Sequence, residues 1–79
     1  MTAIVNISLK QGVLDSQGKA VHHALDSLKF TNVTDVRVGK QIVLQLDTED
    51  KTQAMADVTK MCEEILANTV IEDYKIELH

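Results

Sequence analysis

The residues best suited to chemistry form one short segment near the N-terminus, Gly12-Val13-Leu14-Asp15-Ser16-Gln17-Gly18-Lys19-Ala20-Val21. Two glycines followed by a lysine suggest a phosphate-binding loop, whose pattern is G-x-x-x-x-G-K-[ST]. Here five residues separate Gly12 from Gly18, and Ala20 replaces the hydroxyl that the metal needs. Asp15 would also oppose a bound phosphate. The segment therefore predicts a tight connection from a strand to a helix, with its two apolar residues packed under that helix.

The remaining reactive side chains do not form a site. His22 and His23 are adjacent, so on a helix they point about 100° apart and cannot hold one metal together. No Cys-x-x-Cys, His-x-x-x-His or Glu-x-x-His pair is present, so no metal ligand is predicted. Cys62 lies on an apolar stripe and precedes two glutamates, which favours a buried structural thiol over a nucleophile. We predict no catalytic and no cofactor-binding residue in this chain.

The length of the chain, 79 residues, allows one small domain spanning residues 1–79. A single core below ~80 residues seldom supplies more than about 3–5 kcal/mol, and such domains are usually reinforced by disulfides, metals or association. One cysteine excludes an internal disulfide. Self-association, as a homodimer or a homotetramer, is therefore the expected reinforcement.

The charge and composition of the chain argue against some classes of partner. A net charge of -4 and an aromatic content of 3% argue against binding to nucleic acid. No apolar run approaches the ~20 residues that span a bilayer, so no membrane contact is expected. The N-terminus has no basic region and is predicted to be a strand, not a signal peptide. These features favour a reducing, cytoplasmic setting.

The first half of the chain predicts a strand, a helix and a hairpin. Residues 3–9 alternate between apolar and polar, as in a strand with one buried face. Residues 16–29 carry an apolar stripe with helical spacing, and Asp15 is placed to cap that helix. Residues 35–38 predict a second strand, and a type II′ turn at Gly39 and Lys40 would join it to a third strand over residues 41–46. Val43 is the one apolar residue on the polar side of that third strand.

The second half predicts one more helix and one more strand. The acidic run 47–50 offers several N-caps for a helix whose apolar stripe extends from Ala54 to Leu66. Asn68 is expected to end this helix with a left-handed C-cap. Residues 74–78 alternate as a last strand.

The order of elements predicts an α+β fold of two layers. Strand, helix, strand, strand, helix, strand is the β-α-β-β-α-β, ferredoxin-like order, with two helices on one face of an antiparallel sheet. This arrangement leaves the other face and two edge strands uncovered. Ile4 and Val43 on that open face are consistent with either a partner surface or ordinary scattered apolar residues.

Three segments of the sequence resemble the PurS family. These are the segment 12–21 described above, Val36-Arg37-Val38-Gly39-Lys40, and the tail 66–74, which reads Leu-Ala-Asn-Thr-Val-Ile-Glu-Asp-Tyr. They occur in the same order as in the family, and with the strand pattern they cover nearly the whole chain. The family usually has proline at the positions of Ser16 and Thr69, where this chain would lose local rigidity but no chemical group.

The resemblance implies a function within a larger enzyme. PurS proteins are small subunits of phosphoribosylformylglycinamidine (FGAM) synthase, a glutamine-dependent, ATP-consuming C–N ligase of purine biosynthesis. A glutaminase subunit (PurQ) releases ammonia, and a large subunit (PurL) uses ATP and Mg to convert formylglycinamide ribonucleotide to formylglycinamidine ribonucleotide. The small subunit forms homodimers or larger oligomers, has no catalytic group or cofactor of its own, and joins the other two subunits for ammonia transfer.

Five residues in the matched motifs are not needed for the predicted core. We expect partner contacts from Gln17, Gly18, Lys19, Arg37 and Lys40. Ordinary solvated charge is the simpler interpretation of the two hairpin cations. Two other classes of function remain as alternatives. One is an ACT-like regulatory module that binds small molecules, and the other is an RRM-type RNA-binding domain, which would need aromatic residues on its central strands.

Overall fold

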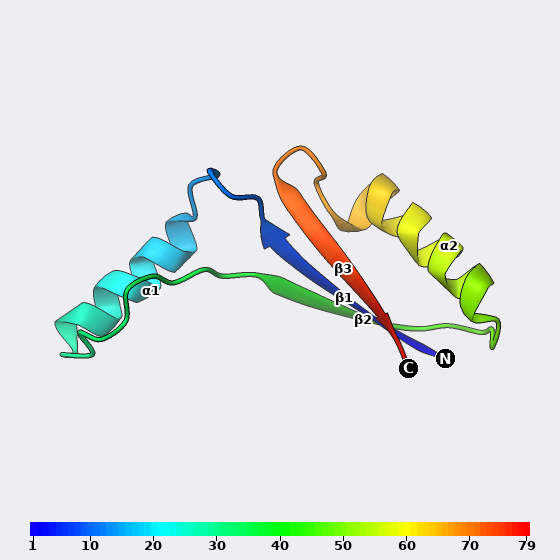
Figure 1. Cartoon of the computed structure of the whole chain (residues 1–79), viewed down its shortest axis with the longest axis horizontal. Coiled ribbons are helices and arrows are strands. Elements are labelled where there is room, and N and C mark those ends of the chain that lie inside the picture. Colours follow the sequence, from blue (N-terminus) through cyan, green and yellow to red (C-terminus); the bar gives the residue numbers. More distant parts are fainter.

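The computed structural model describes all 79 residues, and its elements follow one another as a strand, a helix, a strand, two contiguous helical segments and a strand (Figure 1). None of the helices has the length and apolar character that crossing a bilayer requires. The bounds are β1 (Thr2–Leu9), α1 (Ser16–Ser27), β2 (Lys40–Gln45), α2 (Lys51–Met61), the π-helix η1 (Cys62–Leu66) and β3 (Glu72–Leu78).

The three strands form one antiparallel sheet in the order β2-β1-β3. The central strand β1 places Val5 opposite Ile42 on one side and opposite Ile76 on the other. These three side chains share one face because cross-strand partners point the same way. The α+β, antiparallel class predicted from the sequence is confirmed.

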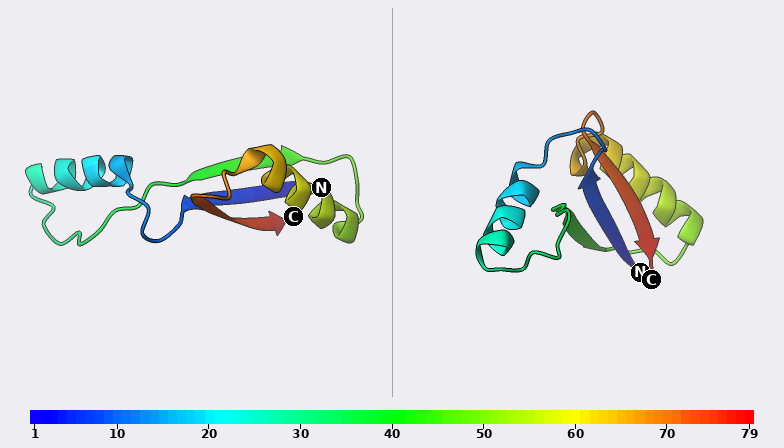
Figure 2. Two further views of the ribbon diagram at one scale, coloured as in Figure 1. Left: turned by 90° about the horizontal axis from the view of Figure 1, so that it is seen from above. Right: turned by 60° about the vertical axis from the view of Figure 1, so that its left-hand side comes forward.

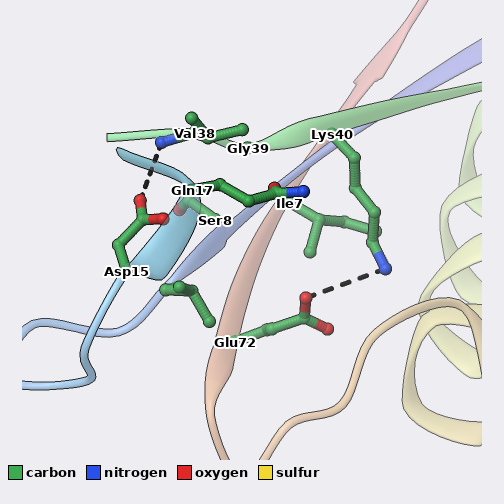
Figure 3. Close-up of a pocket in the computed structure, with 9 residues that line it drawn as sticks. Ile7, Ser8, Asp15, Gln17, Val38, Gly39, Lys40 and Glu72 are labelled. Atoms are coloured by element: carbon green, nitrogen blue, oxygen red, sulfur yellow. Dashed lines mark hydrogen bonds and ion pairs between the residues drawn. The ribbon is translucent and has the colours of Figure 1, made fainter. Parts of the chain in front are cut away.

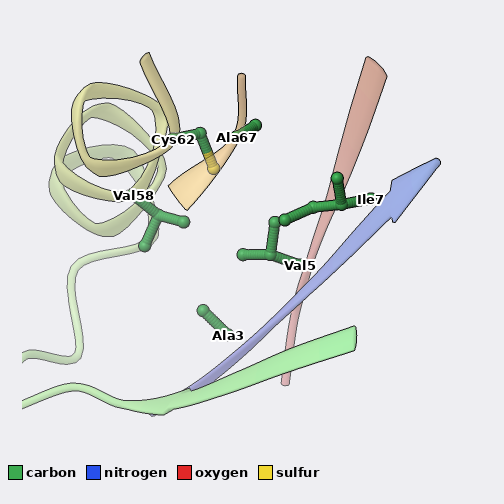
Figure 4. Packing of buried hydrophobic residues seen from close by; sticks show 6 residues of the cluster. All are labelled: Ala3, Val5, Ile7, Val58, Cys62 and Ala67. Carbon is green, nitrogen blue, oxygen red and sulfur yellow. The ribbon is translucent and has the colours of Figure 1, made fainter. Parts of the chain in front are cut away.

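One face of the sheet holds the core. Ala3, Val5 and Ile7 alternate along β1 and are buried against Val58 and Cys62 of the C-terminal helical segments (Figure 4). Apolar residues of the edge strands and of the α2 end surround this cluster. The residues between them on β1, Ile4 and Asn6, point to the opposite face, as the period of two requires.

Side-chain and backbone hydrogen bonds define the two ends of the helical region that starts with α2, and the sequence predicted part of them. One oxygen of Asp50 accepts from the N–H groups of Thr52 and Gln53, so Asp50 is the cap among the candidates in residues 47–50. The last turn widens into η1. The left-handed cap predicted at Asn68 is wrong, because the chain leaves the helix through an extended Ala67. The Asn68 side chain instead accepts from the N–H of Val70 in the following turn.

The helix α1 does not cover the sheet, which corrects the prediction of two helices on one face. It lies beyond the end of the sheet as a separate arm, while α2 alone covers the core face (Figures 1 and 2). It starts at Ser16 as predicted but ends at Ser27, and Lys29 then adopts a left-handed φ of 74°. Leu14 is also exposed instead of packed under the helix. Sequence periodicity shows that α1 has an apolar face but not what that face meets.

The predicted second strand and hairpin are also wrong. Residues 35–38 are extended but pair with no strand, and the chain runs through Gly39 into β2 without reversing direction (Figure 1). The outer edge of β2, where the predicted hairpin partner would pair, is unpaired within the chain. The N–H of Val38 instead donates to the carboxylate of Asp15. A Cβ on Gly39 would lie 2.7 Å from the Ile7 carbonyl oxygen, so this glycine permits close passage and not a turn.

The second face of the sheet is open and mostly polar. Cross-strand hydrogen bonds link Thr2 with Gln45 and Asn6 with Gln41 on this face. The apolar pair Ile4 and Val43 lies between them, and the Val43 side chain is exposed as the sequence predicted.

Candidate partner-docking site

The segment that first suggested chemistry is a structural lock built around Asp15. Its Oδ1 accepts from the N–H of Gly18 at 2.8 Å, which caps α1 as predicted. Its Oδ2 accepts from the N–H of Val38, also at 2.8 Å. One buried carboxylate therefore caps the helix and ties it to a chain segment more than twenty residues away. Because this anion already caps the N-terminus of α1, a phosphate at that position would meet a like charge.

Bonding to the carboxylate also sets its ionisation. The N–H of Val38, followed by that of Gly18, lowers the pKa of Asp15 by stabilising the charged form, and the nearby Arg37 adds to this effect. Partial removal from water acts in the opposite direction and is outweighed. Asp15 is therefore a permanent anion at neutral pH and is not suited to act as a general acid.

Gly18 allows the first turn of α1 to lie against the 36–38 segment. A Cβ at this position would lie 2.3 Å from the backbone oxygen of Val36 and 2.8 Å from Oδ2 of Asp15. Only a residue without a side chain lets the first turn of α1 approach the 36–38 segment this closely. The first glycine of the motif differs, since Gly12 has open space around it and a φ of 86°. The glycine that precedes Lys19 in this motif is thus explained by steric requirements.

The exposed side chain of Arg37 also stabilises the region around Asp15. One of its terminal nitrogens donates to the backbone oxygens of Leu9 and Lys10, at 3.2 and 3.3 Å. Its Nε also lies 3.9 Å from Oδ2 of Asp15. The guanidinium therefore joins the 36–38 segment to the end of β1.

Beside the lock lies a half-open hollow of about 250 Å³, where the end of β1 meets the starts of α1, β2 and β3 (Figure 3). Its polar lining includes Ser8, Gln17, Lys40 and Glu72. The Lys40 ammonium is 3.7 Å from Oε2 of Glu72, while Oε1 of Glu72 accepts from the N–H of Asn68 at 2.7 Å. The hollow is the one place where three strands and α1 supply polar groups together.

The five predicted contact residues divide into two groups in the structure. Gln17, Lys19 and Lys40 are exposed near the start of α1 or beside the hollow, and their polar groups can reach a partner. Gly18 is buried under Val36, and Arg37 already serves backbone carbonyls. We call the three exposed members of the predicted contact set, Gln17, Lys19 and Lys40, the docking face. The sequence analysis missed Glu72, whose place beside Lys40 follows from strand order and has no local signal.

Two other groups, Cys62 of η1 and Tyr74 of β3, have shifted pKa values. Burial, with a further contribution from Glu63, raises the pKa of the Cys62 thiol. A hydrogen bond to Glu63 raises the pKa of Tyr74, whose hydroxyl donates to Oε2 of that glutamate at 2.8 Å. Both shifts favour the neutral form, so neither group is activated as a nucleophile. The buried thiol agrees with the prediction for Cys62.

Comparison with known proteins gives one consistent result. A family model described as "PurS: Phosphoribosylformylglycinamidine (FGAM) synthase" matches residues 2–79. The PurS subunit of Bacillus subtilis is 50% identical over 74 residues, which is 94% of this chain and 87% of that protein. The PurS subunit of Methanocaldococcus jannaschii is 40% identical over 76 residues, covering 96% and 92%.

Solved structures agree with the sequence matches. A structure of B. subtilis PurS superposes with a TM-score of 0.84 at 49% identity, covering 96% of this chain and 94% of that one. A chain in the structure of PurLQS from Thermotoga maritima gives a TM-score of 0.87 at 32% identity, covering 96% and 93%. The three-stranded sheet, the detached helix and the motif around Asp15 thus occur in a chain that belongs to the PurS family of FGAM synthase.

Proposed function

We propose that this chain is the non-catalytic small subunit of a three-protein FGAM synthase, in which it bridges the large synthetase subunit (PurL) and the glutaminase subunit (PurQ) for ammonia transfer. Membership of the PurS family supports this role, as does the relative that forms part of PurLQS in T. maritima. ATP and Mg would be used by the large subunit. A single unpaired cysteine fits a cytoplasmic setting.

The chemistry of the chain supports a non-catalytic role. Its most perturbed carboxylate, Asp15, is fully engaged in structural bonds. Its thiol is buried, and its tyrosine hydroxyl is bonded to Glu63. No three His, Cys, Asp or Glu side chains converge in a way that could hold a metal ion. We propose that the chain contributes its surface and shape to the reaction.

The observation that carries the proposal is the detached arm α1. The chain has a radius of gyration of 16.0 Å, against about 12 Å expected for a compact domain of this length. Its accessible surface is 5839 Å², against about 4,800 Å² expected for a folded monomer of 8.8 kDa. The excess is of the order of one partner's share of a standard protein interface, about 800 Å². We propose that a second copy of the chain covers this surface, in a homodimer or a homotetramer.

The apolar face of α1 identifies where the second copy would pack. Val21 and Leu28, seven residues apart on the helix, are 43% and 68% exposed, and Phe30 just beyond is 55% exposed. Large apolar side chains grouped in this way are unusual on a monomer and typical of an interface. Burying them would add large apolar side chains to a core whose largest fully buried members within one chain are Val5, Val58 and Cys62.

Substituting this face should weaken self-association. In the double variant Val21→Gln and Leu28→Gln we expect a lower molar mass by light scattering at micromolar concentration, because two apolar contacts are lost from the interface. The variant Ile65→Gln is the control, since Ile65 is 81% exposed but belongs to η1 and not to α1. An unchanged mass for the double variant, with circular dichroism showing an intact fold, would rule out α1 as the contact.

The docking face should be needed for glutamine-dependent synthesis. In the double variant Gln17→Ala and Lys19→Glu we expect binding to the large and glutaminase subunits to weaken by about tenfold, the effect of losing one good polar contact. Glutamine-dependent activity of the mixed proteins should fall with it, while activity with added ammonia should persist.

The variant Lys60→Glu is the matched control, because Lys60 is also an exposed lysine of a helix but lies on α2. Co-elution with the two partner subunits, with and without glutamine and ADP, measures assembly directly. Full assembly and full glutamine-dependent activity in the double variant would remove Gln17 and Lys19 from the proposed interface.

A further inference from the structure

We propose that the hollow beside the Asp15 lock binds a free α-amino acid with a small side chain, held through both of its charged groups. This assignment goes beyond the assembly role, and it shares Gln17 and Lys40 with the docking face. It rests on the charges, hydrogen bonds and size of the hollow shown in Figure 3.

The first element of the argument is a pair of opposite charges that are close but not joined by a hydrogen bond. The 3.7 Å between the Lys40 ammonium and Oε2 of Glu72 exceeds hydrogen-bonding distance. The Lys40 side chain is 56% exposed, so its donors are accessible from the hollow. Glu72 is 16% exposed and is oriented by the N–H of Asn68, which bonds its other oxygen. The site therefore presents one donor and one fixed acceptor, each able to form a shorter bond with a ligand.

The second element is the balance of charge. Lys40 and Glu72 cancel, and the Asp15 carboxylate is already satisfied by two backbone N–H groups and by Arg37. A phosphate or a bare cation would meet a site of no net charge and gain little there. A zwitterion matches it, because its carboxylate can accept from Lys40 while its ammonium donates to Glu72. Both contacts are charge-assisted hydrogen bonds.

The third element is the size and remaining lining of the hollow. About 250 Å³ is below the roughly 300–1,000 Å³ of sites for drug-sized ligands and suits a small metabolite. Three apolar residues line it, Ile7, Leu9 and Val38, and they would contact a short side chain. The exposed Ser8 hydroxyl and Gln17 amide supply further polar contacts on the rim. In Figure 3 the Gln17 side chain extends across the hollow toward Ile7 and Lys40.

The test is a titration of the full chain with glycine, L-alanine and L-serine, followed by amide ¹H–¹⁵N NMR at constant pH and ionic strength. We expect saturable shifts at Ser8, Gln17, Lys40 and Glu72, with a Kd of about 1 mM, as for a very small ligand in a half-open site. N-acetyl-L-alanine, which lacks the ammonium, and L-alaninamide, which lacks the carboxylate, should each bind at least about tenfold more weakly.

Two variants test the assigned partners. Lys40→Gln and Glu72→Gln should each abolish saturation by L-alanine, and Gln at position 72 can still accept from the N–H of Asn68, so the fold is retained. Lys75→Gln is the matched control, because Lys75 is an exposed lysine of β3 outside the hollow. Binding of either blocked derivative as tightly as L-alanine, unchanged binding of L-alanine in Lys40→Gln or Glu72→Gln, or shifts confined to other regions would each overturn the proposal.

Discussion

Replacing Gly18 with alanine should destabilise the protein, although alanine is the better helix former. The substitution gains up to about 1 kcal/mol in helix propensity. It also places a Cβ 2.3 Å from the Val36 oxygen, and neither this backbone atom nor the capping carboxylate of Asp15 can move without breaking the lock. Forcing extra atoms into a closed contact costs about 1–3 kcal/mol or more, so we expect a net loss of stability.

Urea unfolding at fixed protein concentration measures this loss, and the backbone amide of Val38 should lose its hydrogen-bonded chemical shift. The control is Gln17→Ala, in the same helical turn but exposed, which should change the free energy of unfolding by no more than about 0.5 kcal/mol. If Gly18→Ala were as stable as the parent chain, the close approach of α1 to Val36 would not exist in solution.

Replacing Asp15 with asparagine should have a comparable effect, although asparagine is itself a good N-cap. The carboxylate uses both oxygens, Oδ1 for Gly18 and Oδ2 for Val38. Asparagine has one oxygen, so its NH₂ group must face one of the two donors, and that N–H loses its partner. We expect the Tm to fall by about 5–10 °C, as for the loss of a cap or of a partly buried hydrogen bond.

Asp50→Asn is the matched control for this prediction. Asp50 caps α2 with Oδ1 alone, which accepts from both Thr52 and Gln53. Asparagine can reproduce that geometry, so its Tm should change little. Equal effects at positions 15 and 50 would show that Asp15 acts only as a helix cap and does not hold the 36–38 segment.

The same bonds predict a dependence on pH. The pKa of Asp15 is lowered in the folded chain, chiefly by the Val38 and Gly18 N–H groups. The stability linked to this carboxylate is therefore present above its unfolded pKa, near 4, and is lost as the pH falls through the lower folded pKa. Urea unfolding between pH 6 and pH 2.5 should show the gap between the parent chain and Asp15→Asn narrowing at the acidic end. A gap independent of pH would contradict the role of the charged form.

The predictions for Gly18→Ala and Asp15→Asn both concern how α1 is attached to the rest of the chain. The lock joins α1 to the 36–38 segment, and Arg37 joins that segment to the end of β1. The arm can therefore present its apolar face and the docking face in a fixed position relative to the sheet. If self-association uses α1, Gly18→Ala and Asp15→Asn should weaken it as well, although neither residue lies on that apolar face.

Local patterns in the sequence determined much of this protein. Alternation along residues 3–9 and 74–78 located the central strand and one edge strand. The helical stripe around Val58 and Cys62 located the helix that covers the core, and Asp15 was identified as a cap. The motif 12–21 identified the family. All of these signals lie within a few residues along the chain, where the backbone period and capping chemistry decide the outcome.

Contacts between distant parts of the chain could be decided only by the tertiary structure. The alternation around Val36 and Val38 predicted a strand, but the Val38 N–H donates to Asp15 at the start of α1 and not to a neighbouring strand. The amphipathic pattern of α1 is the same whether its apolar face meets its own sheet or another molecule, and here it does not meet its own sheet. The second oxygen of Asp15, the space above Gly18 and the pairing of Lys40 with Glu72 depend on segments that are far apart in sequence. Periodicity fixes which face of an element is apolar, but the partner of that face is set by packing in three dimensions.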